Sequence, residues 1–366
     1  MALGVADVNP APAKPSQILT QRQPVNSWYK WLMSSEEENR RGDRSTKDDE
    51  LDALRQRATS VFFIPLDENQ LFSPLALAIT GVGEPFAHVA QAFRANIAGL
   101  LSTIATPFTL ANASAIGRSW QRIHTAERIR SLPLSGEDMS EDAESRREHE
   151  ALARGREKMD EFMKSAEGGK VLIRDTLTFL DHVHLDESLA SAASELLLQG
   201  ILLAWGGFEV LARDSFIAYL NVNPDRSLSL QSDPITKRRF EMSKVPLETL
   251  AAHKFNLSER MGTLFAQQQD LSDVCSIKAA YAALFPADCQ LRDALNDPDL
   301  RVLSLRRNLI VHQRGAVDEA YLGATKCTQH LGERLQVHPD EVEAHLRTVV
   351  NAAAAILRAV GATQQP

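Results

Sequence analysis

One segment, residues 195–220, constrains the fold of this 366-residue chain more than any other. Its apolar residues recur at helical spacing and mark two neighbouring faces. The first face carries Leu197, Ile201, Ala204, Phe208 and Leu211, and the second carries Leu198, Leu202, Trp205, Ala212 and Phe216. A helix that is apolar over so wide an arc needs partners on several sides, so it belongs in the middle of a bundle. The segment therefore predicts an all-α protein built around one central helix.

The rest of the C-terminal half also has helical patterns. Short helices are expected near residues 247–252, 258–268 and 276–285. A longer helix is expected from about residue 298 to 314, with Gly315 as its stop. The last helix is expected to begin at His338 with Pro339 in its first turn, and to close at Gly361. Aromatic residues make up only 6% of the chain, so the core must consist mostly of Leu, Ala, Val and Ile, a composition that favours helices.

Composition divides the chain into four regions. Residues 1–58 are rich in Pro and Gln and then in charge, which predicts a disordered or loosely docked tail. Residues 59–131 predict a helical region of unknown role, and residues 132–170 predict a charged helix or linker. Residues 171–361 are expected to form the helical domain, so the fold class is a C-terminal helical bundle preceded by a mostly helical N-terminal extension.

Three local signals refine the N-terminal half. Residues 61–64 (Val-Phe-Phe-Ile) favour a short β-strand that Pro65 stops. Residues 87–101 and 115–129 have helical spacing. The pair Gly168-Gly169 is expected to end the charged region.

The sequence gives little support for a membrane span or a metal site. The uncharged window between Arg94 and Arg118 contains Asn96, Pro107 and Asn112, so a buried or partner-facing helix is expected there and no membrane span. No secretory signal is recognised at the N-terminus, and a cytoplasmic location is expected. The histidines His182 and His184 point about 200° apart on a helix, which excludes joint chelation unless the segment is extended. His330, His338 and His345 show no ligand spacing and are expected at the surface.

Cysteine usage agrees with a reducing compartment. The chain has an odd number of cysteines, namely Cys275, Cys289 and Cys327, and their spacing matches no C-x-x-C motif. The chain contains no Walker, H-E-x-x-H or G-x-S-x-G motif. Neither a metal nor an organic cofactor is therefore expected.

The chemistry of the chain centres on Arg307-Asn308-Leu309-Ile310-Val311-His312, at the end of an apolar helix. An imidazole moves protons, and a guanidinium holds a phosphate by a charge-assisted fork, so this set is suited to phosphodiester cleavage without a metal. On an ideal helix Arg307 and His312 lie about 140° apart. Either the terminal turn distorts, or a second copy of the helix supplies the partner groups across a two-fold axis.

His312 lies in the last turn, where the negative helix end favours its protonated form and the nearby Arg307 and Arg314 oppose it. A histidine in this position is more often a capping or surface residue, and an Arg-x4-His match often arises by chance. The net charge of −8 argues against a protein that coats nucleic acid, although an RNA-cutting enzyme needs only a local positive patch.

The run continues as Gln313-Arg314-Gly315-Ala316-Val317-Asp318 and then Tyr321. Together with Tyr281-Ala-Ala-Leu-Phe285-Pro286 and Ala204-Trp205-Gly206-Gly207-Phe208-Glu209, it resembles a branch of the bacterial HEPN family of ribonucleases and toxins. The resemblance covers roughly residues 190–350. It implies a helical bundle, a homodimer through the helix of Arg307 and His312, and metal-independent endoribonuclease activity.

The resemblance also implies residue roles. Arg307 and His312 correspond to the catalytic Arg and His, and Asn308 to the polar residue that commonly follows the Arg. The RNA 2′-OH would attack its own phosphate, with His312 as general base or acid and Arg307 stabilising the transition state. The products would be a 2′,3′-cyclic phosphate and a 5′-OH, and DNA would resist. A role as a toxin or anti-phage defence effector, with an antitoxin or defence-system protein as partner, follows from the family alone.

Two further sites are weighed on chemistry. Glu209 lies on the apolar central helix and needs a partner, which is either the local Arg213 or, in a supporting catalytic role, Arg307 or His312. The run Lys237-Arg238-Arg239 is expected in a loop. It could bind RNA phosphates, but a solvated surface is the preferred interpretation.

A rival hypothesis is a non-catalytic helical interaction module that binds a nucleotide or a protein. The two differ in one observable feature. A ribonuclease is expected to expose Arg307, Asn308 and His312 together in a positive groove at a two-fold axis, whereas an interaction module can bury Arg307 in a salt bridge of its own.

Overall fold

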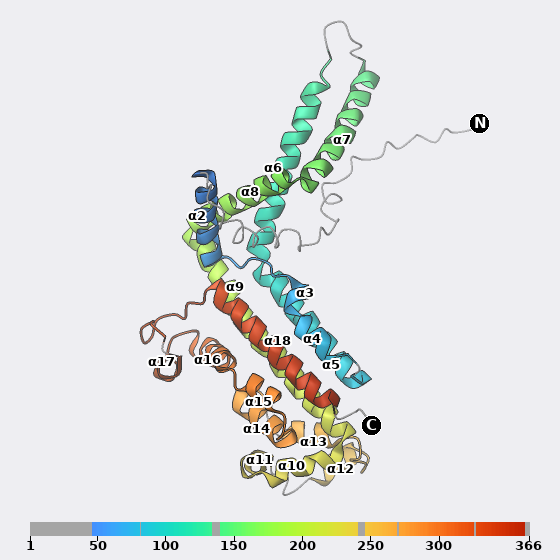
Figure 1. Cartoon of the computed structure of the whole chain (residues 1–366), viewed down its shortest axis with the longest axis vertical. Helices are drawn as coiled ribbons and strands as arrows, with labels where there is room; N and C mark the ends of the chain where they lie inside the picture. The colour runs from blue at the N-terminus through green and yellow to red at the C-terminus, as the bar shows by residue number, and fades with distance from the viewer. Residues whose placement is uncertain are drawn as a thin grey trace, which may run out of the picture. The chain divides into compact units, whose positions relative to one another are not determined.

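The computed structural model describes residues 46–80, 82–133, 140–240, 246–268, 271–325 and 327–362. Over these residues the protein is all-α, as predicted (Figure 1). Extended pairing among them is limited to one isolated antiparallel bridge between Ala316 and Arg334. The fold class is therefore confirmed.

The helices divide between the two halves of the chain. The N-terminal half contains α2 (Thr46–Val61), α3 (Glu68–Leu71), α4 (Ser73–Ala78), α5 (Glu84–Ile104), α6 (Thr106–Arg130), α7 (Glu141–Lys164) and α8 (Ala166–His184). The C-terminal half contains α9 (Glu187–Val222), the 3-10 turn η2 (Pro224–Arg226), α10 (Ser227–Ser232), α11 (Pro234–Arg239), α12 (Leu247–Ala252), α13 (Met261–Gln268), α14 (Val274–Leu284), α15 (Cys289–Leu295), α16 (Pro298–Gln313), α17 (Glu319–Thr325) and α18 (Pro339–Ala362).

The described residues fall into two compact units, which differ from the predicted regions. One unit contains the described residues of 46–48 and 110–176, and the other contains those of 49–109 and 177–362. The predicted region 59–131 is thus divided, and the predicted boundary at residue 171 lies inside α8. The physical reason is the apolar face of α5, which needs the central helix as a partner: Phe93 and Ile97 are buried in the same unit as α9, far along the chain.

The second unit is organised around α9, which runs for 36 residues, or about 54 Å at 1.5 Å per residue. Helices α5, α18, α13 and α16 all pack on it (Figure 1). Gly200 of α9 lets α5 come close, because a Cβ at this position would lie only 3.0 Å from Ile104 Cγ2. The prediction of a central helix with partners on several sides is confirmed.

By length and composition, α9 is also the one helix among the described residues that is long and apolar enough to cross a membrane. In the structure 56% of its apolar window is buried within the protein, and a bundle's core helix has the same composition. The uncharged window 94–118 is divided between α5 and α6.

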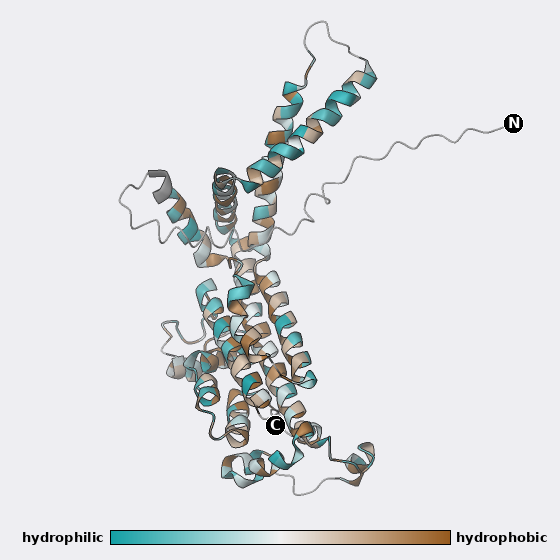
Figure 2. Ribbon diagram, turned by 45° about the vertical axis from the view of Figure 1, so that its right-hand side comes forward, coloured by the Kyte–Doolittle hydropathy of each residue, from teal (hydrophilic) through white to brown (hydrophobic). Residues whose placement is uncertain are grey.

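In the other unit, α6 and α7 carry many hydrophilic residues (Figure 2). Their contact is organised around Glu127, whose buried carboxylate is 2.5 Å from Lys158 Nζ and 2.6 Å from Arg130 Nη1. These cations lower the pKa of Glu127 through the hydrogen bond and charge of Lys158 first and of Arg130 second. The mixed charges of residues 132–170 therefore include an ordered, specific cluster as well as solvated pairs.

Three local predictions are wrong. Thr46–Val61 is a helix, so the predicted tail 1–58 ends earlier; residues 1–45 lie outside the described part. Residues 61–64 form no strand: Phe62 and Phe63 are buried, so their apolar run reflects burial. Gly168 and Gly169 lie inside α8, where a Cβ on Gly168 would meet the Phe162 carbonyl oxygen at 1.9 Å, so this glycine permits the sharp turn from α7.

Candidate functional site

The helix α16 carries the Arg307–His312 motif and lies against α9 and α18. Its N-terminus is fixed by Asp297, whose carboxylate accepts a hydrogen bond from the Asp299 amide at 2.9 Å, with Pro298 in the first turn. The buried face consists of Leu300, Leu303, Ser304, Arg306 and Leu309. Residues 307, 308 and 312 therefore point away from the core or along its edge.

The arginine that α16 buries is Arg306, which the sequence analysis did not single out. Its Nε donates to the Tyr321 hydroxyl at 3.0 Å, its Nη1 donates to His345 Nε2 at 3.0 Å, and its Nη2 donates to Glu341. These partners come from α17 and α18, so one guanidinium joins three helices. The network satisfies a charge that burial would otherwise make costly.

His345 is only 3% exposed, so the prediction that it lies at the surface is wrong, whereas His330 and His338 are exposed as predicted. Burial first, and the charge of Arg306 second, lower the pKa of His345 to about 4. Because Arg306 donates to Nε2, the ring is neutral with its proton on Nδ1. A usable signal existed: His345 lies three residues after Val342 and four before Val349, on the apolar face of α18.

Arg307, one residue further on, is held at the edge of α9. Its Nη1 donates to Asn308 Oδ1 at 3.1 Å, and its Nη2 lies 3.9 Å from Glu209 Oε2. The same Glu209 oxygen accepts a hydrogen bond from Trp205 Nε1 at 3.1 Å, which orients the carboxylate. The side chains of Arg307 and Glu209 are 26% and 27% exposed, so both are reachable from solvent.

Of the contacts considered for Glu209, the structure shows the one with Arg307 on α16. The contact is long for an ion pair and partly exposed, so it contributes little to stability.

His312 lies in the last turn of α16 and is exposed, as is Asn308. Ser304, the third residue of the same face, is buried. The helix stays regular through Gln313, and the αL cap falls on Arg314 at φ 54°, one residue before the predicted stop at Gly315, which follows at φ 79°. The terminal turn therefore does not rotate His312 toward Arg307, and the two side chains remain about 140° apart.

The two helices α9 and α16 also expose apolar side chains. Leu203 and Val210 of α9 and Val311 of α16 are each about half exposed. Gly206, between the two α9 residues, has open space beside it. Leu203 and Val210 are two turns apart on one side of α9, so together they form apolar surface that a partner protein can cover.

Two other segments singled out in the sequence have structural roles. Tyr281 donates its hydroxyl to the Ala212 carbonyl at 2.7 Å and stacks on Phe285, and burial raises its pKa. The basic run Lys237-Arg238-Arg239 ends the short helix α11, so the predicted loop is wrong. Its last member, Arg239, hydrogen-bonds Ser276 and lies 3.6 Å from Asp273.

The described residues form no candidate metal site. His182 and His184 lie in the last turn of α8, where a helix directs them apart. No cluster of three potential metal ligands is found in the described ranges, and the three cysteines are free thiols.

The role of Glu209 is testable with Glu209→Gln. The amide oxygen still accepts from Trp205, while the charge facing Arg307 is lost. We expect RNA cleavage to fall about tenfold, or about 1.4 kcal/mol of barrier. The melting temperature should shift by no more than a few degrees, since the pair is partly exposed. Asp214→Asn, an exposed carboxylate on the same helix, is the matched control, and unchanged cleavage in Glu209→Gln would mean that the pair has no positioning role.

Comparison with known proteins adds no relative. No protein-family model matches the chain. No curated protein and no solved structure matches it either.

Proposed function

We propose that this protein is a metal-independent endoribonuclease of the HEPN type, with an active site built from Arg307, Asn308 and His312 of two copies of the chain. The observation that carries the proposal is the geometry of α16. One regular helix presents an exposed imidazole, an exposed carboxamide and a half-buried guanidinium, and the guanidinium is already oriented by Asn308 and Glu209.

The requirement for two copies follows from the same geometry. Because α16 is regular through Gln313, one chain directs Arg307 and His312 to different sides of the helix. In the proposed dimer, a two-fold axis between the two α16 helices brings the His312 of each chain to the Arg307 of the other. The exposed Leu203, Val210 and Val311 supply apolar surface for that contact.

The proposed reaction forms a bond between the ribose 2′-oxygen and phosphorus and breaks the bond from phosphorus to the 5′-oxygen. The His312 of each site accepts the 2′-OH proton and returns a proton to the leaving 5′-oxygen. Arg307 stabilises the extra negative charge on the phosphoryl oxygens, and Asn308 holds the guanidinium in place. The products are a 2′,3′-cyclic phosphate and a 5′-OH.

One observation favours the rival function, a non-catalytic interaction module. Arg307 faces Glu209 at 3.9 Å and is not fully exposed. In that function the guanidinium serves as an anion contact or a packing residue.

The experiment that tests the proposal is cleavage of a short RNA by the full-length protein in EDTA. Its matched substrate carries a 2′-deoxyribose at the mapped scissile position. We expect the RNA to be cut with 2′,3′-cyclic phosphate and 5′-OH ends, and the deoxy substrate to survive, since it lacks the nucleophile. Binding of RNA without any cutting would favour the interaction module, and ends of another chemistry would overturn the proposed reaction.

A further inference from the structure

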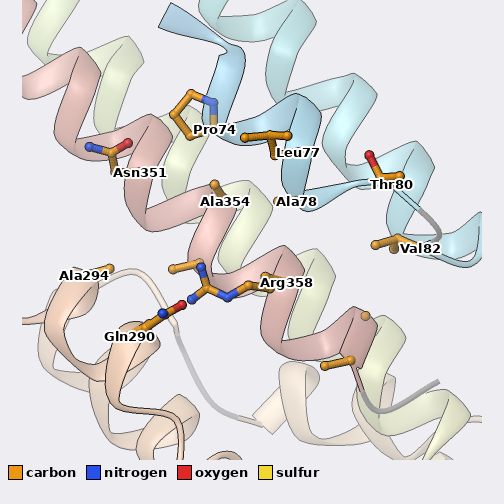
Figure 3. A pocket seen from close by; sticks show the side chains of 13 residues that line it. Pro74, Leu77, Ala78, Thr80, Val82, Gln290, Ala294, Asn351, Ala354 and Arg358 are labelled. Atoms are coloured by element: carbon orange, nitrogen blue, oxygen red, sulfur yellow. The ribbon is translucent and has the colours of Figure 1, made fainter. Parts of the chain in front are cut away.

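A groove on the second unit lies far along α18 from the Arg306 network. It is bounded on one side by α4 and on the other by α15, with α18 as its floor, and its volume is about 580 Å³. Figure 3 shows Pro74 and Leu77 on one side, Gln290 and Ala294 on the other, and α18 between them. None of these residues takes part in the candidate active site.

The floor of the groove has the periodicity of a helix-packing surface. Asn351, Ala354, Ala355, Arg358 and Ala362 recur at i, i+3, i+4, i+7 and i+11 along one face of α18. This face extends over about 16 Å, or three helical turns. Alanines on the floor let the backbone of another helix approach closely, while α4 and α15 limit sideways movement.

The charged side chain that lines the groove is positive, and no negative one accompanies it. No Asp or Glu lines it, although the chain as a whole has a net charge of −8. Arg358 is exposed on the floor, and no ion pair to it is found among the described residues. Figure 3 shows its side chain extending toward the side of Gln290. The guanidinium is therefore available to a carboxylate from outside the chain.

The rim adds exposed apolar area. Leu77 is 79% exposed although it lies on a short helix that packs against α18. A large apolar side chain beside a floor of alanines provides the contact that an apolar anchor of a docked helix would bury.

We propose that this groove binds an amphipathic helix of a partner protein. The apolar residues of that helix, spaced i, i+4 and i+7, lie on Leu77, Ala354 and Ala355, and one of its carboxylates binds Arg358. A helix fits better than a compact small molecule because the residues of the floor follow one face of α18 for about 16 Å. The proposal does not depend on RNA cleavage.

The test uses the full-length protein and two fluorescein-labelled helical peptides of about 15 residues. Both carry leucines at i, i+4 and i+7; one has glutamates flanking the leucine face, and its twin has lysines there. Fluorescence anisotropy is expected to show micromolar binding of the glutamate peptide. Arg358→Glu should weaken that binding at least tenfold and strengthen binding of the lysine peptide.

Matched variants separate the groove from non-specific adhesion. Leu77→Asp should weaken both peptides, whereas Leu185→Asp, at a leucine that is 78% exposed elsewhere, should change neither. Arg238→Glu, at an exposed arginine of α11, should also have no effect. All four positions are exposed, so folding should be preserved.

Two results would overturn the proposal. One is peptide binding that is absent, or equal in wild type and in all variants. The other is self-association of the protein that Leu77→Asp abolishes, which would make a second copy of the chain the occupant.

Discussion

Replacing His312 with alanine is expected to lower the rate of RNA cleavage by about 10²- to 10⁴-fold, the usual contribution of a general acid or base. This is a loss of about 3 to 5 kcal/mol of transition-state stabilisation. The side chain is exposed in the last turn of α16, so the melting temperature should change little. Arg307→Ala should give a similar loss because the phosphoryl charge is left unsupported, and Arg307→Lys should recover little, since an ammonium cannot form the bidentate fork.

The neighbouring Gln313 is exposed in the same turn, so Gln313→Ala is the matched control and should cut RNA normally. A site shared between two chains also predicts that two inactive variants restore activity when they are mixed. When Arg307→Ala and His312→Ala chains are mixed, each mixed dimer contains one site with an intact Arg307 and an intact His312 from different chains. Cutting should return to about a quarter of the wild-type rate for random pairing with two sites per dimer. Cleavage that survives in His312→Ala would end the catalytic assignment, and mixtures that stay inactive would place both groups within one chain.

Lowering the pH from 6.5 to 4 is expected to remove about 3 kcal/mol of folding stability through His345 alone. The folded pKa is about 4, because burial and Arg306 oppose a second positive charge, and the unfolded value is 6.5. Between these values the unfolded chain binds more protons than the folded one, so stability is complete above pH 6.5 and is lost as the pH falls toward 4. Protonation of Nε2 would also break its hydrogen bond with Arg306.

Urea unfolding midpoints measured across this pH range check the prediction. His345→Gln keeps an acceptor for Arg306 without a titrating ring, so its stability should fall much less on acidification. His330→Gln removes an exposed histidine and should follow the wild-type curve. Parallel curves for wild type and His345→Gln would show that other groups cause the acid sensitivity.

Much of the fold could be predicted from periodicity. The central helix, the α16 helix and the last helix follow from apolar spacing that has one dominant interpretation. The assignment of α5 to the second unit could not be predicted, because periodicity identifies a buried face without saying which distant helix covers it. The wrong strand at residues 61–64 has a related cause, since a short apolar run is equally compatible with burial outside a strand.

For the candidate site, the contact between Glu209 and Arg307 was one of two predicted alternatives, because an acid on an apolar helix needs a partner. The network around Arg306 was not predicted. Its members come from α16, α17 and α18, and no local pattern shows that Tyr321, Glu341 and His345 converge on one guanidinium. Of two adjacent arginines, the motif drew attention to Arg307 and left the buried one unnoticed.

These adjacent arginines make the rotational setting of α16 an all-or-none property. One residue turns an α-helix by about 100°, so a single insertion between Leu303 and Arg306 would carry Arg306 away from its three partners and His312 away from its present face. We therefore expect α16 to tolerate substitution at exposed positions but no change of length before the motif. The contacts of Arg306 thus fix the rotation of α16 about its own axis. That rotation decides which later residues of the helix, His312 included, are exposed to solvent.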